Sequence, residues 1–222
     1  MCGRYSQSKR IEQLEEHYHR QLEPGFRTKY EDGDYNVAPS RQCPVVLSDN
    51  IRMMRWGLVP HWAKSLNVGY SLINAMGETL LEKPTFKNLI KSNRCLVPAT
   101  GYYEWLDSEG GKIPYYYYLP DREVFSFAGL WTTKIDAEGQ PLESFTIITT
   151  KPNALTEKVH NRMPAILSVE EESIWIDSKT TDPNQVLKLI KPYPAEKMSA
   201  YKVSKLVGSV TNNSEQLIQR IE

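Results

Sequence analysis

Short segments rich in β-branched and aromatic residues, separated by turn-forming residues, run through most of this 222-residue chain. Segments of this kind favour β-strands, and Asp49-Asn50 between two of them favours a hairpin turn. Because such short strands bury little apolar surface alone, they predict a sheet around a shared core. Strands are predicted at residues 44–48, 51–56, 95–97, 101–106, 115–119, 124–130, 145–150 and 201–203.

Helical periodicity is confined to a few segments. Ile11, Leu14, Tyr18 and Leu22 share one stripe, which predicts a helix over residues 8–22.

The remaining helical signals are short. Ser168 and Glu171 have the spacing of a capping box, which predicts a helix start there. Residues 184–191 are a further helix candidate, residues 78–90 are partly helical, and residues 66–71 are expected to be loop. Few helices beside many strands predict an α+β chain: a single domain over residues 1–222, with a curved, mostly antiparallel, barrel-like sheet and peripheral helices.

Charge and hydropathy limit the classes of function. Lys and Arg total 27 and Asp and Glu total 27, so nucleic-acid binding would need a local basic groove rather than net charge. No apolar run approaches the roughly 18 residues of a membrane span. The first residues lack the apolar stretch of a secretory signal, so we expect a cytoplasmic protein with no membrane partner.

The three cysteines differ in their surroundings. Cys43 and Cys95 have apolar or proline neighbours, which is typical of buried core thiols. The wide spacing and odd number suit neither a disulfide framework nor a metal site, so no metal is expected. Cys2 stands apart because removal of Met1 would leave it as the first residue.

A terminal cysteine offers a chemistry that an internal cysteine lacks. Its α-amine titrates near about 8 and its thiol near about 8.5, so both are partly nucleophilic at neutral pH. The amine can condense with an aldehyde to a Schiff base, and the thiolate can close a thiazolidine ring. Two other interpretations stay open for Cys2: a frayed terminus with no function, and the nucleophile of an N-terminal-cysteine amidotransferase.

Other candidate groups lie in distinct local contexts. Glu104 is flanked by aromatic residues on a predicted strand, where desolvation would raise the pKa of its carboxyl group toward neutrality. His160 precedes a proline in an irregular segment, a common setting for catalytic groups. Asn74 could be a turn residue or could orient a sugar hydroxyl. The segment 55–62 combines tryptophans with a cation, which suits base stacking as well as core packing.

These segments together resemble the SRAP family, the SOS-response-associated peptidases or abasic-site processing proteins. No single match is decisive, but the matches follow the family order from residue 1 to about 213. They are residues 1–5 (MCGRY), 35–39 (YNVAP), 56–62 (WGLVPHW), 73–75 (INA), 95–99 (CLVPA), 101–105 (GYYEW), 127–131 (FAGLW), 147–150 (IITT), 160–164 (HNRMP), 203–204 (VS) and 207–208 (VG).

The resemblance implies covalent crosslinking to abasic sites in single-stranded DNA during the DNA damage (SOS) response. Cys2 would be the nucleophile after autocatalytic loss of Met1, Asn74 would orient its amine, Glu104 would act as acid and base, and His160 would move the second proton. The implied protein is a cytoplasmic, nucleoid-associated monomer without a cofactor. The implied DNA groove consists of Arg4, Asn36, Pro39, Trp62, Thr149 and Arg162.

One departure from the family pattern concerns the DNA groove. The family usually has an arginine after Asn-Ala, where this chain has Met76, so we expect weaker binding with a flatter salt dependence. Two alternative functions stay open. An N-terminal-cysteine amidohydrolase or glutamine amidotransferase would release ammonia from glutamine, whereas a non-catalytic modified-DNA-binding module would bind DNA without forming a covalent product.

Overall fold

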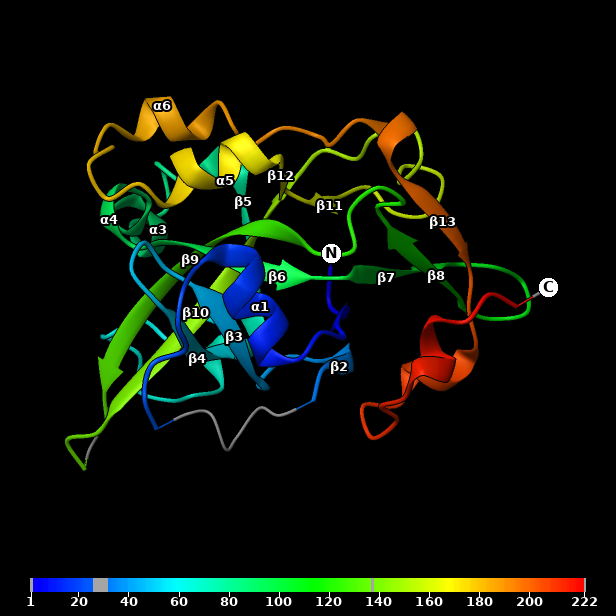
Figure 1. The fold of residues 1–222 in the computed structure, drawn as a ribbon, viewed down its shortest axis with the longest axis horizontal. Helices are drawn as coiled ribbons and strands as arrows, with labels where there is room; N and C mark the ends of the chain where they lie inside the picture. Colours follow the sequence, from blue (N-terminus) through cyan, green and yellow to red (C-terminus); the bar gives the residue numbers. More distant parts are fainter. Residues whose placement is uncertain (1, 26–31, 137, 222) are drawn as a thin grey trace.

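Hydrophobic residues in the central strands alternate between two sides of a sheet. In β6 (Arg94–Ala99), Cys95 and Val97 belong to one core cluster, whereas Leu96 between them belongs to another. Successive side chains of a strand point to opposite faces, so a continuous apolar strand requires cover on both faces. The computed structural model, which describes residues 2–25, 32–136 and 138–221, shows how both faces are covered (Figure 1).

Five strands close into a barrel. Strand β10 pairs with both β4 and β9, so the order β10-β4-β3-β6-β9 returns to its start. Most pairings are antiparallel, and those of β10 with β4 and β5 are parallel. The predicted curved, mostly antiparallel, barrel-like sheet is confirmed. The barrel strands are β3 (Gln42–Val46), β4 (Ile51–Trp56), β6, β9 (Phe125–Ile135) and β10 (Pro141–Thr150).

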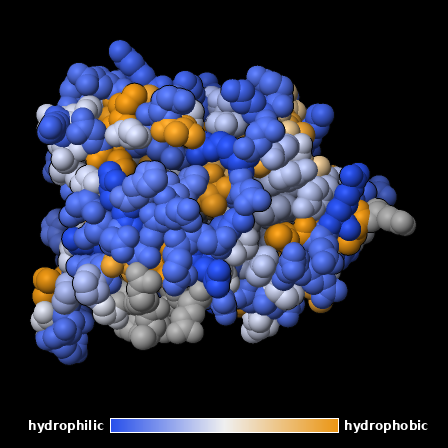
Figure 2. Space-filling model, viewed as in Figure 1, coloured by the Kyte–Doolittle hydropathy of each residue, from blue (hydrophilic) through white to orange (hydrophobic). Residues whose placement is uncertain are grey.

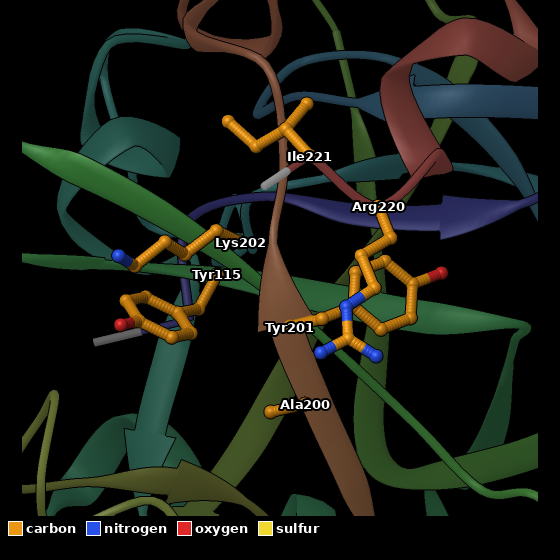
Figure 3. Close-up of a pocket in the computed structure, with 6 residues that line it drawn as sticks. All are labelled: Tyr115, Ala200, Tyr201, Lys202, Arg220 and Ile221. Atoms are coloured by element: carbon orange, nitrogen blue, oxygen red, sulfur yellow. The ribbon is translucent and has the colours of Figure 1, made fainter.

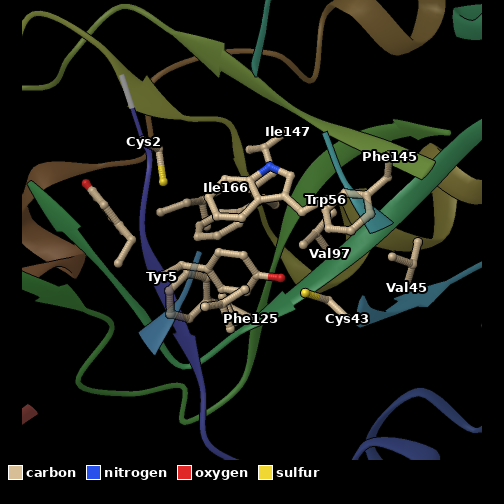
Figure 4. Packing of buried hydrophobic residues seen from close by; sticks show 14 of the residues in the cluster. Cys2, Tyr5, Cys43, Val45, Trp56, Val97, Phe125, Phe145, Ile147 and Ile166 are labelled. Carbon is tan, nitrogen blue, oxygen red and sulfur yellow. The ribbon is translucent and has the colours of Figure 1, made fainter. Parts of the chain in front are cut away.

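The barrel interior is packed with aromatic and aliphatic side chains (Figure 4). The ring of Tyr5 contacts the rings of Trp56 and Phe127 edge-on, with centroids 5.1 and 5.8 Å apart. Edge-to-face contacts of this kind add to the stabilisation from apolar burial. Cys43 and Cys95 are buried, as predicted for core thiols.

A second sheet continues from this core. Its strand order is β13-β8-β7-β1-β2. Alternate residues again divide between two faces: Tyr102 and Tyr117 stack on each other in the barrel cluster, whereas Tyr103 and Tyr116 face a cluster formed with C-terminal residues. The strands are β1 (Tyr5–Gln7), β2 (Asp34–Val37), β7 (Gly101–Leu106), β8 (Ile113–Tyr118) and β13 (Ser199–Lys202).

Helices cover the outside of the barrel. Ile11 and Leu14 of α1 and Trp175 of α5 pack against the outward-facing strand residues. The predicted capping box is confirmed, because the Glu171 backbone N–H donates to Ser168 Oγ and the Ser168 N–H donates to Glu171. The helices are α1 (Ile11–Tyr18), α2 (Val68–Ser71), α3 (Pro84–Lys87), α4 (Leu89–Ser92), α5 (Val169–Ile176) and α6 (Pro183–Leu187).

Several helical segments differ from the prediction. The first helix is shorter than residues 8–22, because His19 adopts a left-handed conformation that ends it. Residues 78–90 are broken because Pro84 begins a new short helix. The predicted loop at 66–71 contains α2, where the backbone of Gly69 packs closely against Gly57.

Short elements complete the fold. Strand β5 (Asn74–Met76) pairs with β10, and β11 (Met163–Pro164) and β12 (Ile166–Leu167) pair with β10 and β9. The 3₁₀ helices are η2 (Gly77–Thr79), η3 (Ala195–Lys197), η4 (Lys205–Gly208) and η5 (Glu215–Ile218). Within the described part of the chain, every helix is too short or too polar to span a bilayer. The face in Figure 2 is mostly hydrophilic, with apolar residues in small separate patches.

Candidate active site

Cys2 lies three residues before the start of β1, which pairs with β7. The Arg4 carbonyl accepts a hydrogen bond from the Tyr103 N–H at 3.0 Å, which aligns the start of the chain with β7. The Cys2 side chain is 0% exposed, and its sulfur is directed toward the barrel cluster (Figure 4). Asn74 donates from Nδ2 to the Cys2 carbonyl at 2.8 Å. The structure therefore brings together two of the four predicted catalytic residues by direct contact.

Burial controls the ionisation of the Cys2 thiol. Desolvation, followed by the nearby negative charge of Glu104, raises the pKa of the thiol well above its usual range. Its Sγ makes a long contact of 3.9 Å with the Arg4 carbonyl. The expectation that this thiol is partly ionised at neutral pH is wrong for this conformation, because the sequence does not reveal that the terminus enters the core.

Asn74 is a strand residue rather than a turn residue. Its backbone pairs in register with Ile147 of β10, and its side chain reaches the Cys2 carbonyl. Its Nδ2 is occupied by Cys2, whereas its Oδ1 is buried and has no hydrogen-bond partner among the described residues. A buried amide oxygen without a partner is costly, so this atom is a ready acceptor for an added donor.

Glu104 lies on β7 in the predicted aromatic surroundings. Its side chain is buried, and desolvation raises the pKa of its carboxyl group to about 7. This outcome confirms the expectation from the flanking rings. A carboxyl group with a pKa near neutrality can both donate and accept a proton at physiological pH. The same charge acts on the Cys2 thiol, which places the two groups in one site.

His160 lies in the irregular segment between β10 and β11. Its Nδ1 is 3.0 Å from the backbone nitrogen of Arg162 and 3.2 Å from its carbonyl oxygen. Burial lowers the pKa of the imidazole, so the ring is neutral at pH 7. The positive charge of Lys112 lowers the pKa of both His160 and Glu104, as a smaller effect than burial.

Four of the six predicted DNA residues form two contacting pairs, and the first pair is Arg4 with Asn36. Arg4 donates from Nη1 to Asn36 Oδ1 and to the Val207 carbonyl, each at 2.7 Å. The Asn36 amide donates to carbonyl oxygens of the C-terminal segment, the shortest being that of Asn212 at 2.8 Å. Asn36 is fully buried. Its side chain therefore holds Arg4 and the C-terminal segment in place.

The second pair is Thr149 and Arg162. Arg162 donates from Nη2 to the Thr149 carbonyl at 2.8 Å. Its Nη1 and Nη2 also contact the two carboxylate oxygens of Glu78 at 2.8 Å each. A guanidinium group has two N–H bonds on each terminal nitrogen, so one Nη1 N–H stays outside these contacts.

The remaining two DNA candidates lie in turns. Pro39 is half-buried in the turn after β2. Trp62 is 57% exposed in the segment after β4, so its ring is accessible for stacking. Met76, at the position of the usual family arginine, is also exposed and pairs in register with Thr149.

Sequence reasoning did not single out Lys112 or Glu78. Lys112 lies in the turn between β7 and β8, and its sequence context carries no signal for the site. Glu78 acts through a long-range ion pair that no local pattern signals. Among the residues that the structure describes, His, Cys, Asp and Glu side chains nowhere form a group of three that could hold a metal ion.

The fold and the site define a class of protein: a β-barrel with helices outside, and a buried cysteine at residue 2 that contacts an amide and lies near a carboxyl group. The model of the SOS response associated peptidase (SRAP) family matches residues 1–210. The chain therefore belongs to the SRAP family, which confirms the resemblance.

Individual relatives match over nearly the whole length. The abasic site processing protein YoqW of Bacillus subtilis (strain 168) is 44% identical over 225 residues, with 99% of each chain covered. The abasic site processing protein HMCES of Gallus gallus is 32% identical over 224 residues, covering 85% of this chain and 66% of its own. A solved protein structure from Bacteroides thetaiotaomicron has a TM-score of 0.91 and 34% identity, with 100% of both chains covered.

Proposed function

We propose that this protein processes abasic sites in DNA and captures them covalently at Cys2. The processing role is supported by the names of its relatives, which are called abasic site processing proteins. The finer proposal is a thiazolidine crosslink to single-stranded DNA in the DNA damage (SOS) response. The observation that carries it is the contact of Asn74 with Cys2 beside a carboxyl group with a pKa near 7.

The first requirement is a free amine on Cys2, which removal of Met1 supplies. We propose that the chain makes this cleavage itself. Asn74 already holds the Cys2 carbonyl, and its buried Oδ1 could accept a hydrogen bond from the new amine. An amine held by that acceptor would keep its lone pair for the aldehyde carbon of the opened sugar.

The raised thiol pKa favours attack by the amine before the thiol. The amine adds to the aldehyde carbon to give a carbinolamine, and protonated Glu104 donates a proton to the departing hydroxyl group. One water leaves and an iminium ion forms. The new positive charge beside the thiol lowers the thiol pKa. His160 accepts the thiol proton, and sulfur attacks the iminium carbon to close the ring.

The DNA strand would lie against the pair of Arg4 with Asn36 and the pair of Arg162 with Thr149. Arg4 and Arg162 are cations held in fixed orientations by Asn36 and Glu78. Cations of this kind position phosphates without reading sequence. The exposed ring of Trp62 would stack on a base next to the abasic site. The balanced net charge is compatible with this arrangement, because the cations act locally.

Variants of Cys2 test the proposal. Wild-type protein mixed with single-stranded DNA carrying one abasic site should give a heat-stable adduct on a denaturing gel. Cys2→Ala should give none, and Cys2→Ser should give an imine that survives heating only after borohydride reduction, because serine lacks the thiol that closes the ring. Cys43→Ser is the matched control and should crosslink as wild type does. Efficient crosslinking by Cys2→Ala would contradict the assignment of the nucleophile.

A further inference from the structure

Three neighbouring strands of the second sheet carry a cross-strand row that begins at Glu104. Glu104 of β7 pairs with Tyr115 of β8, and Tyr115 pairs with Lys202 of β13. Directly paired residues of antiparallel strands point to the same face. Tyr115 and Lys202 therefore share the face of the sheet that bears Glu104. Strands are spaced about 4.8 Å apart, so the row extends about 10 Å from Glu104 to the sheet edge.

A surface cavity of about 530 Å³ lies at the far end of this row. Figure 3 shows Tyr115 and Lys202 next to each other on one side of β13, and Tyr201 and Arg220 on the other side. Ala200 leaves room between them, because its side chain is small. Tyr115 also packs against the barrel cluster that contains Cys2, so the cavity is connected to the site through one ring.

The cavity is lined by two cations, Lys202 and Arg220. Among the residues that the structure describes (2–25, 32–136 and 138–221), no carboxylate forms an ion pair with Lys202 or Arg220. The other lysine close to the site, Lys112, pairs with Asp107 at 3.4 Å. A lysine beside a tyrosine ring, as Lys202 lies beside Tyr115, suits a ligand with both a phosphate and a flat ring.

We propose that Tyr115 and Lys202 form a subsite for the nucleotide next to the abasic site. Tyr115 stacks on its base, and Lys202 contacts its phosphate. The proposal rests on the proposed function, since it places a DNA strand across Glu104. It also assigns a path for that strand: from the abasic sugar at Cys2, across β7 and β8, to the edge strand β13.

Binding of an intact single strand tests the subsite separately from the chemistry. The probe is a fluorescein-labelled single-stranded oligonucleotide without an abasic site, titrated by anisotropy at several salt concentrations. Lys202→Gln should weaken binding and reduce the slope of log K against log salt by about 0.7, as expected for loss of one phosphate contact on a single strand. Tyr115→Ala should weaken binding by about tenfold, whereas Tyr115→Phe should retain the affinity because it keeps the ring.

The controls separate the possible failures. Lys179→Gln removes one charge from the exposed loop between α5 and α6 and should leave the affinity and slope unchanged. A wild-type affinity and salt slope in Lys202→Gln would overturn the subsite. Its charge reversal, Lys202→Glu, should weaken binding further if the contact is real. Failure of the wild-type protein to crosslink abasic DNA would overturn the proposed function itself, whatever the anisotropy of the intact strand shows.

Discussion

Cys2 and Glu104 are two acidic groups whose neutral forms are favoured by burial. Burial deprives the thiolate and the carboxylate of the hydration that would stabilise their charge, so the pKa of each group rises. Each negative charge would also disfavour the other. In the proposed mechanism, this pair holds protons at the place where the carbinolamine loses its hydroxyl group. We infer that the buried environment serves the dehydration step more than it serves thiolate attack.

The raised pKa of Glu104 has a consequence for stability. The carboxyl pKa rises from 4.5 to about 7 on folding, so the folded state holds the proton more tightly. This contribution is fully present below pH 4.5 and is lost as pH rises through about 7, with an upper limit of roughly 3 kcal/mol. Glu104→Gln should therefore raise the Tm relative to wild type at pH 8, by several degrees, and the difference should shrink toward pH 5. Thermal unfolding across this pH range measures it, and a difference independent of pH would contradict the account.

The same carboxyl group should shape the pH dependence of crosslinking. Glu104 donates a proton in the proposed dehydration, and its protonated fraction falls as pH rises through about 7. The single-turnover rate of adduct formation should therefore decline on the alkaline side in wild type. Glu104→Gln should be slower at every pH and should lack that decline. A quench-flow or gel time course gives both profiles, and an unchanged alkaline decline in Glu104→Gln would assign the ionisation to another group.

At the scale of elements, the site depends on contacts between segments distant in sequence. β5 and η2 are held against the 160s segment by the ion pair of Glu78 with Arg162, whose side chains are 39% and 13% exposed. The Arg162 backbone nitrogen in turn lies 3.0 Å from His160 Nδ1. Glu78 thus fixes the segment that carries His160, although it touches no proposed reacting group.

Glu78→Gln tests this positioning role. It replaces a charged bidentate contact by a neutral one, so we expect about 1 kcal/mol lower stability because the pair is partly exposed. Crosslinking should slow, and its pH profile should shift because His160 loses its fixed orientation. Glu82→Gln, an exposed acid just after η2, is the control for charge. A purely structural role would lower the Tm without moving the pH profile.

The larger strands could be predicted from the sequence because their patterns are local. β7 begins and ends at the predicted residues 101 and 106, since alternating aromatics fix its register. β1, β2 and β5 were not predicted as strands, because segments of three or four residues carry too little pattern. Asn74 belongs to β5 only because β10 offers a partner.

The properties of the site residues were likewise predictable only where they depend on neighbours in the sequence. The desolvation of Glu104 was foreseeable, because its aromatic neighbours adjoin it in the chain. The burial of Cys2 and the contact of Arg162 with Glu78 were not, because each depends on a partner dozens of residues away. The DNA-groove residues were assigned from the family resemblance alone, and their contacts with DNA stay predictions.

At the scale of the whole molecule, the two sheets share one core cluster, so the site can draw on residues that lie far apart in the sequence. β10 contacts β4, β5 and β9, so displacement of one strand disturbs the rest. The C-terminal segment pairs back onto the residue that follows β13, through the bridge of Val203 with Arg220. We therefore propose that residues 1–222 form one cooperative unit. Fluorescence and circular dichroism should report a single coincident unfolding transition in urea, and two separate midpoints would indicate two units.

The most direct test of the account is the intact mass of the protein before and after it meets single-stranded DNA with one abasic site. The purified chain should lack the mass of Met1. After mixing, it should gain the mass of the oligonucleotide less one water, and peptide mapping should place the DNA on Cys2. Retention of Met1 in protein that crosslinks, or an adduct on any other residue, would contradict the central claim.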